Sequence, residues 1–166
     1  MNLWIETQRE ALLEVLSRVD LALLNDAEAR QLAGTPNLAQ AAEMVLDMGP
    51  EFVVIKKGEY GATLVSRDDY FSIPSYPLPN VVDPTGAGDS FAGGMVGFLA
   101  RRNECCSREL RRAVAFGTVI ASACVEDFSV TGLTGLGNGE LRRRYEVLRE
   151  IVRFEAMEWG DLDSPQ

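Results

Sequence analysis

One stretch of the chain combines small residues with a carboxylate at a spacing that suits phosphoryl transfer. Gly86, Ala87 and Gly88 carry almost no side chain, so their backbone N–H groups can approach an anion closely. They stand where a helix is expected to begin, and the positive end of the helix dipole points the same way. Asp89 follows in the first helical turn, where a carboxylate beside a bound phosphate can take a proton from an attacking hydroxyl. The sequence therefore predicts an anion cradle next to a general base.

The same residues allow a plainer interpretation, in which Asp89 only caps a helix behind a glycine turn. A capping box would require Glu or Gln three residues after the cap, but position 92 is alanine. Gly93 and Gly94 each cost roughly 1 kcal/mol relative to alanine inside a helix, which indicates close packing or close ligand approach. Both observations favour the chemical interpretation.

Short apolar runs alternate with amphipathic segments along the chain. The runs at 21–24 and 52–55 are typical of strands covered on both faces, and residues 62–66 and 70–73 predict a hairpin. The three prolines in 74–79 indicate an extended connector. This alternation predicts one α/β domain over the whole chain, with a mainly parallel sheet. Helices are expected over residues 7–19, 27–33, 38–48, 89–102, 107–125 and 140–157.

The composition excludes several classes of protein. A chain of 166 residues can bury a real core as a single domain, and the absence of histidine excludes Ser/His/Asp triads and histidine zinc sites. The net charge of −9 argues against a nucleic-acid partner. No apolar stretch approaches the roughly 18 residues that cross a bilayer, so no membrane partner is expected. The unpaired pattern of Cys105, Cys106 and Cys124 fits a reducing cytoplasm.

Three segments of the chain resemble motifs of one family. Residues 83–94, Asp-Pro-Thr-Gly-Ala-Gly-Asp-Ser-Phe-Ala-Gly-Gly, resemble the second signature of the ribokinase-like, or PfkB-type, carbohydrate kinases. Residues 25–28, Asn-Asp-Ala-Glu, are similar to the family's N-x-x-E motif, and residues 56–61 to its glycine-containing nucleotide loop. The resemblance implies a Rossmann-like, three-layer α/β/α ribokinase-like fold. It also implies an ATP-dependent kinase that phosphorylates a hydroxymethyl group of a sugar or nucleoside.

The resemblance assigns roles around the transferred phosphoryl group. Asp89 is expected to deprotonate the acceptor hydroxyl, while the amides of Gly86, Ala87 and Gly88 stabilise charge on the γ-phosphoryl group. Lys56 is expected to reach a phosphate.

Other positions are expected to bind the nucleotide and its cations. Glu28, with Asn25 beside it, is expected to organise Mg²⁺ and its waters around the ATP phosphates. Asp83 and Thr85 resemble positions that help to bind a monovalent cation in some relatives. The backbone is expected to pass close to the nucleotide at two glycines and to line the adenine pocket at a third. These glycines are Gly58, Gly61 and Gly117.

Two of these patterns also have structural interpretations. The Asn25-x-x-Glu28 pattern alone is a common helix cap. The arginine run at 142–144 is expected to lie on a solvated helix surface rather than in a binding site.

The acceptor-binding half of the family is not recognisable in this sequence. We therefore expect the chain to be the C-terminal, nucleotide-binding half of a kinase, truncated relative to the family. Its uncovered sheet edge predicts a homo-oligomer. Three functions stay open: a carbohydrate kinase, a catalytically silent nucleotide-binding or assembly module, and a vitamin-precursor kinase of the same superfamily. The residues do not name the acceptor.

Overall fold

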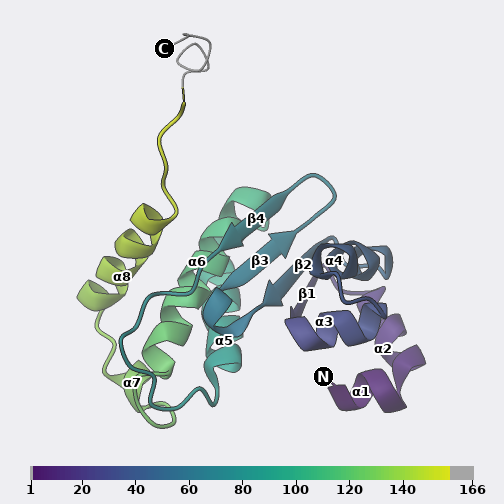
Figure 1. Cartoon of the computed structure of the whole chain (residues 1–166), viewed down its shortest axis with the longest axis horizontal. Coiled ribbons are helices and arrows are strands. Elements are labelled where there is room, and N and C mark those ends of the chain that lie inside the picture. Colours follow the sequence, from purple (N-terminus) through teal and green to yellow (C-terminus); the bar gives the residue numbers. More distant parts are fainter. Residues whose placement is uncertain (1, 158–166) are drawn as a thin grey trace, which may run out of the picture.

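The computed structural model, which describes residues 2–157, has a mixed sheet at its centre (Figure 1). Within this range the sheet has four strands in the order β1-β2-β3-β4. β1 and β2 are parallel, whereas β2–β3 and β3–β4 are antiparallel. The strands are β1 (Leu21–Asn25), β2 (Phe52–Lys56), β3 (Ala62–Val65) and β4 (Tyr70–Ile73).

The expectation of a mainly parallel sheet is wrong, although the hairpin within it is confirmed. Only residues 57–61 separate β2 from β3, and a parallel connection needs a crossover of about a dozen residues or more. The short loop therefore forces β3 to return antiparallel to β2, and the hairpin adds β4 in the same manner.

Four helices share a core with one face of the sheet, and the last two of them pack directly on its strands. They bury alternate strand side chains such as Leu24, Val53 and Ile55, which share one core cluster with the helices. The expected helix over 7–19 is shorter in the structure, where it covers residues 9–16, and a separate short helix over residues 2–7, which was not expected, precedes it across Gln8. The helices are α1 (Asn2–Thr7), α2 (Arg9–Leu16), α3 (Asp26–Ala33) and α4 (Leu38–Asp47).

The remaining α-helices lie on the opposite side. Phe91 and Met95 of α5 join Phe52 and Val54 of the sheet in a second core, and α6 packs between α5 and α8 (Figure 1). The two cores on opposite faces make the three layers. These helices are α5 (Ala87–Arg102), α6 (Ser107–Cys124), α7 (Thr131–Thr134) and α8 (Asn138–Ile151), the last ending earlier than expected.

β1 forms one edge of the described sheet and has no strand partner beyond β2 in residues 2–157. Its Leu21 and Leu23 are only partly buried against the α5–α6 core. On α5, the side chain of Val96 is 53% exposed. One end of the sheet therefore keeps apolar side chains in contact with solvent. None of the helices in the described range is both long and apolar enough to span a membrane.

Candidate nucleotide-binding site

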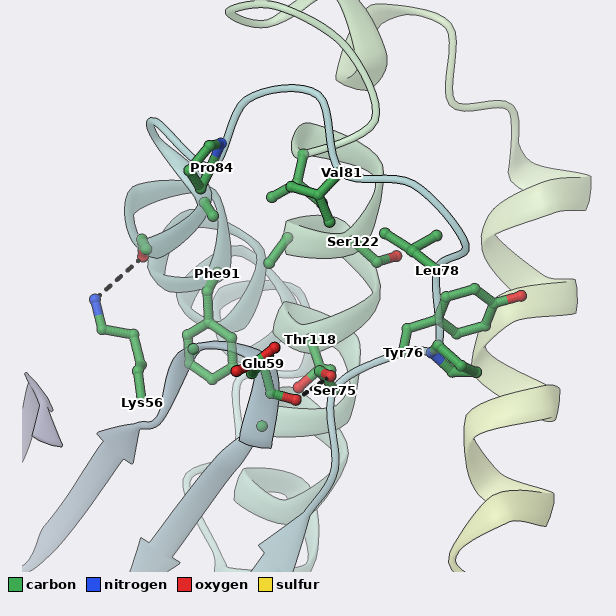
Figure 2. Close-up of a pocket in the computed structure, with 17 residues that line it drawn as sticks. Lys56, Glu59, Ser75, Tyr76, Leu78, Val81, Pro84, Phe91, Thr118 and Ser122 are labelled. Atoms are coloured by element: carbon green, nitrogen blue, oxygen red, sulfur yellow. Dashed lines mark hydrogen bonds between the residues drawn. The ribbon is translucent and has the colours of Figure 1, made fainter.

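A cavity of about 640 Å³ lies beyond the carboxyl end of β2 (Figure 2). It is bounded by the start of α5, the C-terminal part of α6 and the connector that follows β4. Figure 2 shows it extending from Lys56 on one side to Tyr76 and Leu78 on the other. Five residues expected at a phosphate or nucleotide line it: Lys56, Gly58, Gly61, Ala87 and Gly88.

The small residues before Asp89 form the first turn of α5. Gly86 precedes the helix at φ +80°, a left-handed conformation that suits glycine. The N–H of Ala87 donates to the carbonyl of Pro84 at 3.2 Å and closes the turn. The N–H groups of Gly86, Gly88 and Asp89 have no backbone partner anywhere in residues 2–157. The N–H of Ala87 is therefore already engaged within the chain, although it was expected to bind the phosphoryl group. The N–H groups of Gly86 and Gly88, on either side of it, are the open donors.

The loop before this turn is anchored to the end of α6. The N–H groups of Val82 and Asp83 both donate to the carbonyl of Val125, at 2.8 and 3.3 Å. The Asp83 carboxylate accepts the N–H of Thr85 at 2.9 Å, and hydrogen bonds from Thr85 hold the pKa of Asp83 below its ordinary value. Asp83 and Thr85 thus shape the turn without lining the cavity.

Lys56 brings a positive charge to the start of α5. Its Nζ lies 3.5 Å from the carbonyl oxygen of Gly88, the contact drawn as a dashed line in Figure 2. A Cβ on Gly88 would lie only 2.8 Å from this Nζ, so a larger residue would displace the ammonium group. An ammonium group beside open amides at a helix N-terminus is suited to bind an anion such as phosphate.

Asn25 and Glu28 lie at the same edge of the sheet as Lys56. Asn25 is the register partner of Lys56 in the β1–β2 pair. Its Oδ1 accepts the N–H of Glu28 at 2.7 Å, and Glu28 Oε2 accepts the N–H of Asn25 at 2.8 Å. The pair therefore forms the capping box of α3, as the structural interpretation predicts, and it does not line the cavity.

The donor set suits a magnesium ion carried by a nucleotide better than an ion held in a protein cage. No group of three or more acidic or thiol side chains that could hold a metal ion is found in residues 2–157. Mg²⁺ usually keeps several waters and is bound through one or two carboxylates plus substrate phosphates. Glu28 supplies one carboxylate at this edge of the sheet, so the residues present fit that mode of binding.

Asp89 is the third residue of α5, and its side chain is exposed. This side chain makes no hydrogen bond or ion pair with any other residue in the described range. It is not among the residues that line the cavity, so it stands beside the cavity rather than within its wall. Its carboxylate is therefore accessible to a molecule that binds next to the first turn of α5.

Gly61 lies where the β2–β3 loop meets the end of β4. It has φ +86° and ψ −140°, and its carbonyl accepts the N–H of Lys57 at 2.7 Å. A Cβ at this position would lie 2.0 Å from the carbonyl oxygen of Ile73. Glycine is therefore required by the close approach of two backbone segments. The 3₁₀ turn Gly58–Tyr60 completes this loop.

Gly117 does not line the cavity, so the expectation for it is not met. A Cβ on Gly117 would lie 2.7 Å from the carbonyl oxygen of Phe91 and 3.3 Å from Cβ of Met95. The residue lets α6 approach α5 closely, which explains its position. The cavity wall on α6 is formed by its neighbours Thr118, Ala121 and Ser122.

The connector between β4 and α5 supplies a wall that sequence reasoning missed. Its prolines predict an extended segment, but only the fold shows that it runs across α6 (Figure 2). A hydrogen bond of 2.5 Å from Ser75 Oγ to the carbonyl of Glu59 fixes its start. The wall residues from the connector are Ser75, Tyr76, Pro77, Leu78 and Val81.

Comparison with known proteins decides the family. The sequence matches the pfkB family carbohydrate kinase model over residues 2–134. The chain belongs to the pfkB family of carbohydrate kinases. This pfkB chain is 36% identical to the cytidine kinase of Thermococcus kodakarensis over 111 residues. The aligned region covers 64% of the chain and 40% of that relative. The chain is 38% identical over 76 residues to the aminoimidazole riboside kinase of Salmonella typhimurium, covering 46% of the chain and 24% of the relative.

Solved structures agree with this assignment. The aminoimidazole riboside kinase from Salmonella enterica, complexed with aminoimidazole riboside and an ATP analogue, superposes with a TM-score of 0.75 at 26% identity. The match covers 84% of the pfkB chain and 46% of that structure. A fructokinase from Vibrio cholerae with fructose, ADP and calcium ion bound gives a TM-score of 0.74 at 19% identity. This match covers 82% of the pfkB chain and 44% of the fructokinase, and it supports the fold alone. The chain thus has the ribokinase-like α/β fold and spans less than half the length of these relatives.

Proposed function

We propose that this chain is the nucleotide-binding part of an ATP-dependent phosphotransferase whose acceptor is a hydroxymethyl group of a sugar or nucleoside. One observation carries the proposal: the Lys56 ammonium group lies beside Gly88 at the cavity wall, and the N–H groups of Gly88 and of Gly86, just before the helix, have no backbone partner in residues 2–157. Membership of the pfkB family supports it, as do relatives named as nucleoside and sugar kinases.

In the proposed mechanism the terminal phosphate of ATP lies at the start of α5. The amides of Gly86 and Gly88, the helix dipole and Lys56 stabilise the charge that develops during transfer. Asp89 takes the proton of the acceptor hydroxyl as that oxygen attacks the γ-phosphorus.

Cations complete the proposed site. Bound magnesium supplies charge neutralisation on the phosphates, and Glu28, with Asn25 beside it, is the proposed holder of its waters. Asp83 and Thr85 are the proposed neighbours of a monovalent cation, because their turn stands directly before the cradle.

A catalytically silent nucleotide-binding or assembly module is the second candidate. The specific observation in its favour is length, because the chain spans 40% of the cytidine kinase and 46% of the aminoimidazole riboside kinase structure. Positioning of both reactants accounts for most of phosphoryl-transfer catalysis, so a partial kinase domain can bind nucleotide without turnover.

ADP formation from Mg·ATP, measured with a panel of pentoses, hexoses and nucleosides, separates these candidates. Acceptor-dependent ADP release supports the kinase. Binding of Mg·ATP without any acceptor-dependent release supports the silent module. A chain that binds no nucleotide contradicts the kinase and the nucleotide-binding module, and leaves only the assembly role.

We also propose that the chain is a homo-oligomer that pairs at the β1 edge. The edge strand and its partly exposed Leu21 and Leu23 leave apolar surface that a second copy can cover. Light scattering behind a sizing column should therefore give at least twice the mass of one chain. A monomer that persists at high concentration argues against the proposal.

A further inference from the structure

Arg144 of α8 is a buried charge at the centre of a polar cluster. Only 8% of it is exposed, although the arginine run 142–144 was expected on the surface. That expectation is wrong for this residue because α8 packs along α6 and turns one of the three arginines inward (Figure 1). Its Nε lies 2.7 Å from Glu140 Oε1, its Nη2 2.5 Å from Glu126 Oε2 and its Nη1 3.1 Å from Ser122 Oγ.

The cluster keeps its charges. Burial alone would lower the pKa of Arg144, but Glu140 and Glu126 outweigh this effect and raise it. Hydrogen bonds from Arg143 and Arg144 lower the pKa of Glu140 to about 2. Arg144 is therefore a fixed, ionised donor at neutral pH.

Arg144 also holds the connector. Its guanidinium carbon lies 5.2 Å from the centre of the Tyr76 ring, within the range of a cation–π contact. Tyr76, on the connector, and Ser122, on α6, both line the cavity. Arg144 itself is not a lining residue. It thus contacts two lining residues, Ser122 and Tyr76, the second of which lies at the end of the cavity away from Lys56 (Figure 2).

Its bonds to Val119 and Arg144 limit the hydrogen bonds that the Ser122 hydroxyl can make with a ligand. The Ser122 hydroxyl donates to the carbonyl of Val119 at 2.6 Å and accepts from Arg144 at 3.1 Å. A serine hydroxyl has one proton and two lone pairs, so only one lone pair remains for another partner. A group that meets Ser122 in the cavity must therefore be a hydrogen-bond donor.

We propose that Arg144 is a positioning residue for the nucleotide base, which anchors the Ser122 hydroxyl, an acceptor toward the cavity, and the ring of Tyr76. The amino group at position 6 of adenine donates, whereas the oxygen at the same position of a 6-oxopurine accepts. The arrangement therefore selects ATP over 6-oxopurine nucleotides. This inference rests on the proposed function, because it takes the cavity to be the nucleotide site.

Calorimetric dissociation constants for Mg·ATP and for the magnesium complex of inosine triphosphate test the proposal. These two nucleotides differ only at position 6 of the base and in the accompanying N1 proton. The wild-type chain should bind ATP about tenfold more tightly, the usual worth of one mismatched hydrogen bond. Arg144→Gln and Ser122→Ala should each bring the ratio of the two constants close to one. Arg149→Gln is the matched control, since Arg149 is exposed on the same helix and its ion pair within the described part of the chain is with Glu146.

Melting temperatures without nucleotide separate positioning from a structural role. If Arg144→Gln and Ser122→Ala only melt earlier and keep the wild-type ratio, the inference is overturned. If Arg144→Gln does not fold, Ser122→Ala decides alone, because it leaves both carboxylate partners of Arg144 in place. A wild-type chain that binds both nucleotides equally overturns the inference but not the proposed function. A chain that binds neither overturns both.

Discussion

Asp89→Asn is expected to lower kcat by roughly 10²- to 10⁴-fold, the usual effect of losing a positioned base. Asparagine has the same shape as aspartate but cannot accept the proton of the acceptor hydroxyl. The side chain is exposed and has no partner in residues 2–157, so the substitution should not disturb the fold. KM for ATP should change little, because the proposed phosphate contacts come from Lys56 and the α5 amides. Steady-state ADP formation with the best acceptor of the panel gives both constants.

Asp68→Asn is the control for this prediction. Asp68 is also exposed, but it lies in the turn between β3 and β4 and does not line the cavity beside α5. The control should keep the wild-type kcat. If Asp89→Asn also keeps it within a few-fold, Asp89 is not the base.

Gly61→Ala is expected to destabilise the fold by about 3 kcal/mol or more. Gly61 has φ +86°, and an added Cβ would lie 2.0 Å from the carbonyl oxygen of Ile73 and 2.5 Å from the carbonyl carbon of Pro74. Both neighbours are backbone, so neither can move without separating β4 from the β2–β3 loop. The midpoint of urea unfolding, with an unchanged slope, measures the loss.

Gly58→Ala is the matched control in the same loop. Gly58 also has a positive φ, +56°, but an added Cβ would meet no atom within 4 Å. It should therefore cost only about 1 to 2 kcal/mol, the usual penalty for a left-handed residue with a side chain. Equal losses for the two variants would show that the contact with β4 does not matter.

Local patterns were sufficient to predict most elements of the fold. The apolar runs at β1 and β2, the hairpin and the glycine that ends α3 are local features, and all are observed. The direction of the strands was not predictable from burial, because a strand covered on both faces has the same pattern in parallel and antiparallel sheets. The break at Gln8 has no glycine or proline to mark it.

The candidate site shows the same division between local and tertiary information. The family resemblance assigned Lys56, Gly61 and Gly88 to the nucleotide and its phosphates, and in the structure these three residues line one cavity. The resemblance did not show that the amide of Ala87 closes a turn on Pro84. The position of Arg144 depends on how α8 packs against α6, and no feature of the arginine run distinguishes it from its neighbours.

The affinity for Mg·ATP of Lys56→Met, compared with Lys57→Met, is the most direct test of the phosphate cradle. The two residues are the only lysines of the chain, but Lys56 lies beside Gly88, whereas Lys57 contacts Ser72 Oγ at 3.2 Å and does not line the cavity. We predict that calorimetry will show binding to the wild-type chain, a loss of about tenfold or more for Lys56→Met, and no change for Lys57→Met. Equal affinities for both variants and the wild type, or no binding at all, would contradict the cradle.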